Sequence, residues 1–149
     1  MKLSTKGRYG ARAMLELAFN YGKRPVLLRE ISERQCISAS YLERMMTALV
    51  CAGLVRSSRG QRGGFTLAKP PKEISLAQIV QVVEGSIAPV ACVDDPKLCN
   101  RVDTCITHDI WIKLKEAMLN VLESITLEKM VEMQRKKWLK QKNIEILLK

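Results

Sequence analysis

Three cysteines and the single histidine of the chain lie within a segment of 17 residues. Cys92, Cys99, Cys105 and His108 have the spacing Cys-x6-Cys-x5-Cys-x2-His. Three thiolates and an imidazole can converge on one metal centre, and soft sulfur ligands select zinc, copper(I) or an iron–sulfur cluster. Structural zinc sites commonly use closer cysteine pairs, so the wide spacing favours a larger object such as a cluster. A structural zinc ion and unliganded reactive thiols stay open as alternatives.

A second group of residues with possible chemistry lies in a glycine-rich segment. Residues 59–64 read Arg-Gly-Gln-Arg-Gly-Gly, so two guanidinium groups stand among three glycines. Glycines let a backbone approach DNA closely, and an arginine can enter a narrow minor groove. We therefore expect Arg59 and also Arg62 to contact DNA. A solvent-exposed turn is the alternative interpretation.

The distribution of charge also indicates a nucleic-acid partner. The 149 residues carry a net charge of +10, and residues 1–70 hold 13 Lys and Arg against 4 Asp and Glu. Residues 71–149 hold 12 and 11, so the basic excess is almost entirely N-terminal. A localised positive field is expected of a protein that neutralises phosphates and releases their counterions. A well-solvated basic surface is the alternative.

The first 70 residues contain the elements that would position these arginines. Residues 1–21 predict a helix opened by Ser4 or Thr5, with apolar residues at helical spacing, namely Tyr9, Ala13, Met14, Leu17, Ala18 and Tyr21. Residues 28–35 predict a second helix, and residues 38–52 predict a third with Ser38 as its N-cap. Gly53 suits a helix C-cap, and residues 54–67 read as strand, turn and strand. Together these elements predict a winged helix-turn-helix.

The third predicted helix would be the recognition helix of this motif. Its N-terminal exposed residues would face base edges, which makes candidates of Ser40, Tyr41, Glu43 and Arg44. Glu43 would accept from cytosine N4, although Ser40-x-x-Glu43 also has the spacing of a capping box. Arg44 would reach guanine or a phosphate, and Ser40 and Tyr41 better suit phosphates, which position without specifying. Ser38 and Arg8 complete the predicted DNA-binding set.

The second half of the chain predicts connecting and assembly elements. Residues 75–84 predict a helix closed by Gly85, whereas residues 86–107 show no periodicity and contain the three spaced cysteines. A heptad-like seam then predicts a long dimerisation helix, with packing on its own domain as the alternative; the seam is Trp111, Leu114, Met118, Val121 and Ile125. Thr126 can cap a last helix over residues 127–139, whose basic residues we interpret as a solvated face.

Composition excludes several other classes of protein. No apolar run approaches the roughly 20 residues of a membrane span, and the N-terminus lacks a secretory signal, so we expect a cytoplasmic protein without membrane contact. One histidine and no Cys-x-x-Cys argue against a hydrolase and a thiol oxidoreductase. We predict no catalytic residues, no small-molecule substrate and no enzymatic activity. Cys51, near the end of the recognition helix, is expected to be buried, and Cys36 lies in the turn.

Several segments together resemble the IscR-type family of iron–sulfur winged helix-turn-helix transcription regulators, whose relatives include NsrR, RirA and CymR. The resemblance covers nearly the whole chain to about Val131. It rests on the Cys92/Cys99/Cys105/His108 set and on the segments MKLSTKGRYG, REISERQCISASYLERMMTALVCAGLVRSSRGQRGGFTL and IW..L...M...L..ITL.

The resemblance implies a homodimer on palindromic double-stranded promoter DNA, with an iron–sulfur cluster controlling which operators are bound. Cys92, Cys99, Cys105 and His108 match the ligands of a 2Fe-2S cluster in the IscR branch. Glu43 matches the recognition-helix glutamate that acts there as a specificity switch, and Arg59 matches the minor-groove arginine of the wing.

The chain also departs from its relatives at several positions. Arg8 stands where some relatives have a carboxylate ligand, so an arrangement of the NsrR type is disfavoured. The first cysteine gap is one residue longer than usual, Cys36 replaces a common glycine, and Arg62 replaces a wing glycine.

We therefore expect a mainly α protein with a small β-hairpin wing and a long dimerisation helix. Residues 1–70 would bind DNA, residues 71–107 would form a connecting helix and cluster loop, and residues 108–149 would form the dimerisation helix and a basic C-terminal helix. The expected function is that of a regulator, most simply a repressor, in which loss of the cluster frees the loop and resets the recognition helices.

Overall fold

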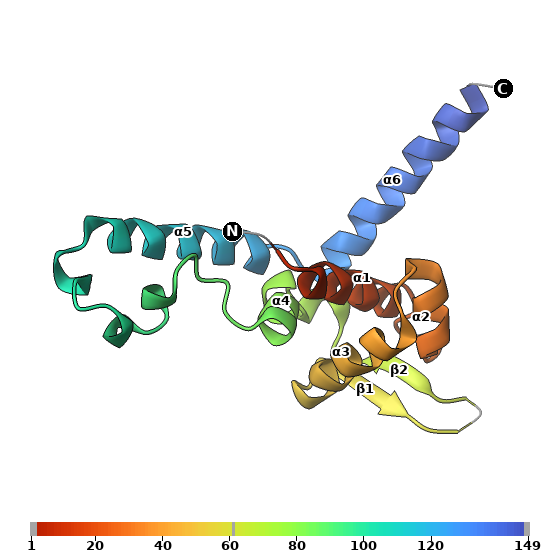
Figure 1. The fold of residues 1–149 in the computed structure, drawn as a ribbon. Helices are drawn as coiled ribbons and strands as arrows, with labels where there is room; N and C mark the ends of the chain where they lie inside the picture. Colours follow the sequence, from red (N-terminus) through yellow and green to blue (C-terminus); the bar gives the residue numbers. More distant parts are fainter. Residues whose placement is uncertain (1–2, 61, 148–149) are drawn as a thin grey trace.

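The computed structural model describes residues 3–60 and 62–147, and it is mainly helical with one small hairpin (Figure 1). The helices are α1 (Thr5–Phe19), α2 (Leu28–Gln35), α3 (Ala39–Cys51), α4 (Leu76–Glu84), α5 (Ile106–Glu123) and α6 (Leu127–Leu147). The hairpin consists of β1 (Val55–Ser58) and β2 (Gly64–Leu67). Short 3₁₀ turns are η1 (Pro71–Glu73), η2 (Ala91–Val93), η3 (Pro96–Leu98) and η4 (Val102–Thr104). The predicted mainly α winged helix-turn-helix fold is confirmed.

Helix α1 lies at the centre of the fold and begins where the capping signal predicts. The Ser4 side chain accepts a hydrogen bond from the Lys6 amide, and Ala13, Met14 and Leu17 are buried in the core. Gly7 is buried against Glu84 of α4 and leaves no room for a side chain, since a Cβ at this position would lie 2.6 Å from Glu84 Oε1. Tyr21 was expected on the inner stripe but is exposed, since α1 ends at Phe19 and helical spacing stops there.

The turn between α2 and α3 depends on an unusual backbone conformation at Cys36. Its φ of 52° is left-handed, a conformation that most side chains avoid and that glycine adopts readily. Ile37 is then buried, and its carbonyl accepts from the Ser32 hydroxyl at 2.6 Å. Ser38 occupies the predicted N-cap position of α3, but its side chain makes no capping hydrogen bond.

Helix α3 packs its predicted apolar stripe into the core and ends as its sequence indicates. Leu42, Met45, Met46 and Leu49 are buried. After the C-cap, Gly53 adopts a φ of 71° and donates to the Val50 carbonyl at 2.9 Å. This closes the last turn in the manner of a C-terminal glycine cap.

The hairpin is antiparallel and is fastened to the body by one additional bridge. Val55 pairs with Leu67 and Ser58 pairs with Gly64. Val26 exchanges backbone hydrogen bonds of 2.9 and 2.8 Å with Phe65, which anchors β2 to the segment before α2. Both strands lie within residues 54–67, where the sequence predicts a strand, a turn and a second strand.

Helix α6 continues beyond the predicted end at residue 139, to Leu147. Thr126 Oγ1 accepts from the Lys129 amide at 3.2 Å, as the expected cap, and Leu127 and Val131 are buried. The sequence from 127 to 147 contains no glycine or proline that would end a helix. Trp138 also stacks on Phe19 at a ring distance of 5.0 Å. In Figure 1, α6 rises from the side of α1 opposite the hairpin.

None of the helices in the described residues is both long enough and apolar enough to cross a membrane.

Candidate nucleic-acid interface and cysteine loop

The exposed ridge of α3 carries Ser40, Glu43 and Thr47, which recur at helical spacing. The capping-box interpretation of Ser40 and Glu43 is wrong, because Ser40 is the second residue of α3 and Ser38 is the N-cap. Within the described part of the chain, the Glu43 carboxylate takes part in no hydrogen bond. The Thr47 hydroxyl donates to the Glu43 carbonyl at 2.8 Å. The sequence pattern also puts Thr47 on this exposed face, but Thr47 is not among the residues predicted to bind DNA, which were chosen from the N-terminal part of the helix.

The neighbouring flank of α3 borders a hollow of about 280 Å³ between α1, α3 and α4. Tyr41, Arg44 and Ala48 line it from α3, Lys6 lines it from α1, and Met45, Val82 and Val83 complete the lining. Tyr41 is half-buried and packs edge-on against Tyr9, with ring centroids 5.7 Å apart and planes at 84°. Lys6 is a functional candidate that the sequence did not indicate, because only the packing of α1 places it beside Arg44.

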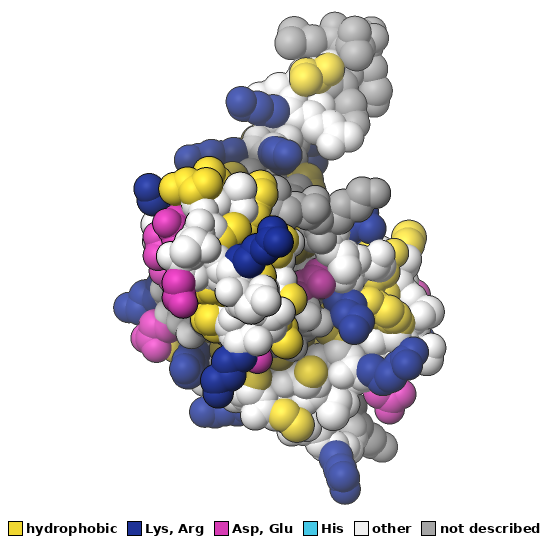
Figure 2. All heavy atoms as spheres, turned by 60° about the vertical axis from the view of Figure 1, so that its left-hand side comes forward, with side chains coloured by type: hydrophobic (Ala, Val, Ile, Leu, Met, Phe, Trp, Pro, Cys, Tyr) yellow, Lys and Arg dark blue, Asp and Glu magenta, His cyan; other side chains and the backbone are white. Residues whose placement is uncertain are grey.

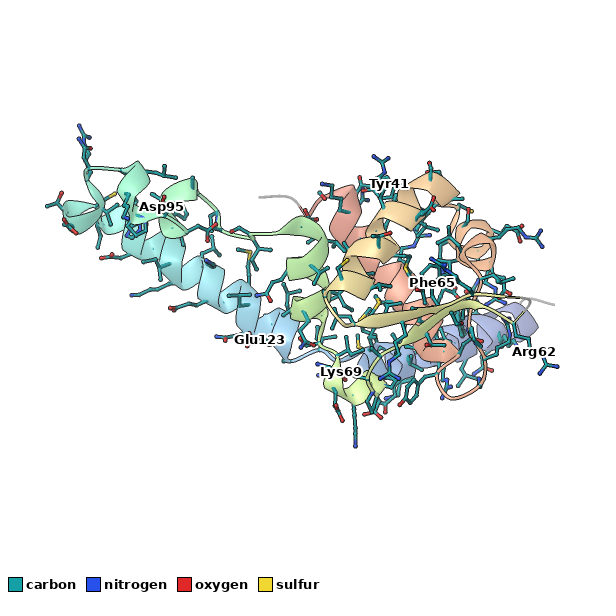
Figure 3. All side chains as sticks on the ribbon, turned by 90° about the horizontal axis from the view of Figure 1, so that it is seen from below. Tyr41, Arg62, Phe65, Lys69, Asp95 and Glu123 are labelled. Carbon is teal, nitrogen blue, oxygen red and sulfur yellow. The ribbon has the colours of Figure 1, made fainter. Side chains whose placement is uncertain are left out.

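The wing places both of its arginines at an exposed tip. Arg59 and Arg62 are exposed, and Gly60 has a φ of 101° that suits glycine. A Cβ at Gly63 would lie 2.5 Å from the Ser58 carbonyl oxygen, so the turn closes only with glycine there. Gln61 lies outside the described residues. Figure 3 shows Arg62 at the tip of the hairpin, pointing away from the body of the molecule.

Two arginines one turn apart on α1 have different surroundings. Arg8 is exposed, and its guanidinium donates only to Thr5 Oγ1 at 3.3 Å among the described residues. Arg12 lies over the Tyr9 ring, 5.7 Å from its centroid, and donates to Gln35 Oε1 at 2.7 Å and to the Gln35 carbonyl. Arg12 therefore joins α1 to the end of α2, whereas Arg8 is available to a phosphate.

The cysteine loop consists of short 3₁₀ turns that lead into α5. Cys92 lies in η2, Cys99 follows η3, and Cys105 is the N-cap of α5; all three are half-buried. His108 is buried in the first turn of α5, and its Nε2 lies 3.1 Å from the Cys92 carbonyl oxygen. A hydrogen bond with the Thr107 hydroxyl, followed by one from the His108 amide, lowers the pKa of the Cys105 thiol.

The structure brings only part of the predicted metal set together. Cys92 and His108 are in contact through the Cys92 backbone, but across residues 3–60 and 62–147 no three His, Cys, Asp or Glu side chains are gathered closely enough to hold a metal ion. The prediction for Cys51 was wrong: this residue is exposed, because it falls off the buried stripe at the end of α3. Cys36 is exposed as well.

A salt bridge ties the cysteine loop to α5. Lys115 Nζ lies 2.6 Å from Asp94 Oδ1, two residues after Cys92. The hydrogen bond with Lys115, and then one with Ser86, lowers the pKa of Asp94. Figure 3 shows the loop, marked by Asp95, at the far end of α5 from the winged helix, with Glu123 near the body.

Helix α5 leaves many apolar side chains uncovered by its own chain. Val121 is 59% exposed and Ile110 is 50% exposed, while Trp111, Leu114 and Met118 are half-buried. Ile125, the last residue of the predicted seam, is half-buried but lies beyond the end of α5, in the turn before α6. A largely apolar hollow of about 630 Å³ lies beside α5 and is lined by Met118, Val121 and Leu122 together with the segment 86–89. Figure 2, in which this end of the molecule comes forward, shows hydrophobic side chains among charged ones at the surface.

Comparison with known proteins relates the chain to a family of regulators. Residues 3–133 match the Rrf2 family, described as iron-dependent transcriptional regulators. The chain is 41% identical over 128 residues to the HTH-type transcriptional regulator CymR of Bacillus subtilis, covering 86% of this chain and 88% of that one. It is 41% identical over 134 residues to IscR of Photorhabdus laumondii, covering 90% and 81%.

Solved structures give the same relationship. The structure of IscR from T. potens superposes with a TM-score of 0.75 at 40% identity, covering 90% of this chain and 88% of that one. The structure of CymR, the global cysteine regulator of B. subtilis, gives 0.74 at 38% identity, covering 89% and 98%. These relatives are regulators and not enzymes, as the sequence predicts for this protein. The chain belongs to the Rrf2 family of transcriptional regulators.

Proposed function

We propose that this regulator is a homodimeric repressor that binds double-stranded promoter DNA and is controlled by an iron–sulfur cluster. The observation that carries the DNA-binding part is that α3, with its exposed ridge, and the hairpin lie together on the side of the molecule away from α6 (Figure 1). A recognition helix in the major groove and a wing in the adjacent minor groove require this arrangement.

Different parts of α3 would contact the bases and the phosphate backbone of the DNA. Glu43 stands on the exposed ridge, where a carboxylate can accept from cytosine N4. Ser38 and Ser40 lie at the start of the helix, where their hydroxyls suit phosphates. Tyr41 and Arg44 lie on the flank and also position the helix against the backbone. Arg8 adds a phosphate contact from α1, and Arg59 and Arg62 extend the wing toward the minor groove.

Helix α5 is the proposed dimerisation element. The exposed and half-buried residues of its seam are Trp111, Leu114, Met118, Val121 and Ile125. Burial of such a seam against a second copy stabilises the dimer by about 25 cal/mol for each Å² of apolar surface removed from water. We assign residues 1–70 to DNA binding, residues 71–107 to the connecting helix and cluster loop, and residues 108–149 to dimerisation and the basic C-terminal helix.

The donor chemistry of the cysteine loop fits an iron–sulfur cluster of the 2Fe-2S type. Cys92, Cys99 and Cys105 are free, half-buried thiols in one loop, and His108 lies in contact with the Cys92 backbone. Thiolate and imidazole are the ligands that such a cluster uses. When bound, the cluster would supply an iron centre sensitive to its chemical surroundings. Since no three such donors lie close enough among the described residues, cluster binding would require the loop to draw these side chains together.

A salt bridge, a hydrogen-bond contact and a series of packed helices connect the loop to the recognition helix. The Asp94–Lys115 salt bridge and the contact of His108 with the Cys92 carbonyl fasten the loop to α5. Helix α5 packs on α4, and α4 packs on both α1 and α3. A change in the loop therefore reaches the recognition helix through packed elements. A coupling of about 1–3 kcal/mol would already change operator affinity by roughly 5- to 150-fold.

Selection of a preferred duplex from a random library, followed by equilibrium binding, tests the DNA-binding proposal. Arg59→Ala is expected to weaken binding to the selected duplex by about 1–3 kcal/mol, because it removes a groove contact. Arg135→Ala, an exposed arginine on α6, is the matched control and should bind as the wild type does. Unchanged affinity of Arg59→Ala would remove Arg59 from the interface. Failure to select any preferred sequence would contradict the function itself.

Control by thiols without a cluster is the second candidate. The chain resembles CymR, the global cysteine regulator of B. subtilis, about as closely as it resembles IscR. A solved structure titled as an oxidised form of Staphylococcus aureus CymR is also similar, with a TM-score of 0.72 at 35% identity. All five cysteines of this chain are at least partly exposed. Iron and sulfide analysis separates this candidate, and a zinc-holding loop, from a cluster sensor.

A further inference from the structure

The hollow between α1, α3 and α4 is lined by three polar side chains from two helices. Lys6 comes from α1, and Tyr41 and Arg44 come from α3. Met45, Ala48, Val82 and Val83 line the rest, so the hollow has an apolar floor beneath a cationic rim. Low-dielectric walls with charges of one sign concentrate the electric field and attract an anion.

The charge of Lys6 acts on the nearby Glu84 carboxylate at the start of α1, but both cations remain available to such a ligand. Neither Lys6 nor Arg44 forms a salt bridge within the described part of the chain, whereas Arg24, Arg29 and Arg34 all do. The N-terminus of α1 is not the anion site. Its amides are already used: Ser4 and Gly7 donate to Glu84 Oε1 at 2.8 and 2.9 Å, and Lys6 donates to Ser4 Oγ at 3.0 Å. The side chains therefore supply the site.

We propose that Lys6, Tyr41 and Arg44 form a phosphate seat that holds one backbone phosphate of the DNA duplex that α3 reads. The proposal rests on the proposed DNA-binding function and adds α1 to it through Lys6. Because the seat is bordered by α3 itself, the phosphate fixes the position of the recognition helix while Glu43, on the adjacent ridge, faces the bases.

The seat makes a specific prediction about salt dependence. Each phosphate neutralised contributes about 0.9 to the slope of log K against log salt concentration. Lys6→Gln should therefore reduce the slope by about 0.9 for each protomer bound, measured by fluorescence anisotropy with the selected duplex over a series of potassium chloride concentrations. Tyr41→Phe keeps the ring packed on Tyr9 and should weaken binding without changing the slope, since it removes no charge.

Lys140→Gln is the matched control, because Lys140 is an exposed lysine on α6, which projects away from the hairpin side. It should retain the wild-type slope. Relative affinities of Lys6→Gln for duplexes of different sequence should match the wild type, since a phosphate contact carries no sequence information. A wild-type slope for Lys6→Gln, with specific binding intact, would overturn the phosphate seat alone. Absence of specific binding by the wild type would overturn the proposed function.

Discussion

Glu43 presents an exposed carboxylate on the outward ridge of α3, where its effect on DNA binding depends on the base it meets. Opposite a cytosine amino group, the carboxylate gains a hydrogen bond. Opposite an acceptor, it remains a desolvated and unpaired charge, which costs affinity. The Thr47 hydroxyl already donates to the Glu43 carbonyl, so the Glu43 carboxylate is the better candidate for polar discrimination on this ridge.

Glu43→Ala is expected to bind a wider range of operators. Removal of the charge abolishes the penalty against unfavourable bases, so affinities for mismatched duplexes should rise toward that of the preferred duplex. The change at a discriminated position should be about 1–3 kcal/mol. A binding-site library measured for the wild type and the variant checks this. Glu132→Ala removes an exposed carboxylate from α6 and serves as control; identical relative affinities for Glu43→Ala and wild type would contradict the role.

At the scale of elements, Glu84 connects the end of α4 to the start of α1. Its carboxylate accepts hydrogen bonds from the backbone amides of Ser4 and Gly7, and it fits there because Gly7 has no side chain. Burial alone would raise the pKa of Glu84, but the hydrogen bonds from Ser4 and Gly7, with a smaller contribution from the charge of Lys6, hold it below the ordinary value.

This contact predicts a pH-dependent part of the stability. The lowered pKa in the folded state means that ionised Glu84 stabilises the fold above its unfolded pKa of about 4.3, and that this contribution is lost as the pH falls through the folded pKa. Glu84→Gln should lower the free energy of unfolding by about 1 kcal/mol at neutral pH. The difference from wild type should shrink in acid. Urea denaturation at several pH values measures it, with Glu123→Gln as control; a difference independent of pH would contradict the assignment.

Helix α5 carries the prediction for assembly. Val121 is more than half exposed, so Val121→Glu should leave the protomer folded while placing a charge in the seam. We expect a monomer by analytical ultracentrifugation and a loss of operator affinity of about 100-fold or more, because two linked half-sites are no longer bound together. Asn120→Glu adds the same charge on the polar face and should remain a dimer. A dimeric Val121→Glu protein would place the interface elsewhere.

Local signals in the sequence predict most of the elements and fewer of the contacts between them. The stripe of Leu42, Met45, Met46 and Leu49 and the cap at Thr126 lie within single elements, so their periodicity and capping are visible in the sequence. Helix α6 runs eight residues beyond its predicted end, because no glycine or proline interrupts residues 127–147.

The contacts that build the site depend on tertiary packing. Lys6 and Arg44 line the same hollow only because α1 and α4 pack against α3, and no spacing in the sequence indicates this. Arg8 and Arg12 are one turn apart in the sequence, yet only Arg12 donates hydrogen bonds to Gln35. The cysteine spacing indicates a shared ligand, but in the described residues His108 contacts Cys92 and Cys105 only through backbone groups, and no three donor side chains are gathered.

At the scale of the whole molecule, the proposed sensor and reader lie at opposite ends. The cysteine loop lies beyond α5, and the winged helix lies on the other side of α4 (Figure 1). The Asp94–Lys115 salt bridge is partly exposed to solvent, and such ion pairs contribute little stability, so this contact alone holds the loop to α5 only weakly. Under the proposed function, a cluster that gathers the thiols would therefore change the loop at small cost and act on the dimer through α5.

Anaerobic purification followed by a visible spectrum and by iron, sulfide and zinc analysis tests control by a cluster most directly. We predict a brown protein with about two irons and two sulfides per chain. Cys92→Ala should lose both, Cys51→Ala should retain both, and removal of the cluster should change operator affinity by roughly 5- to 150-fold. A colourless wild-type protein that holds one zinc ion, or no metal, and binds its operator with unchanged affinity would contradict cluster control.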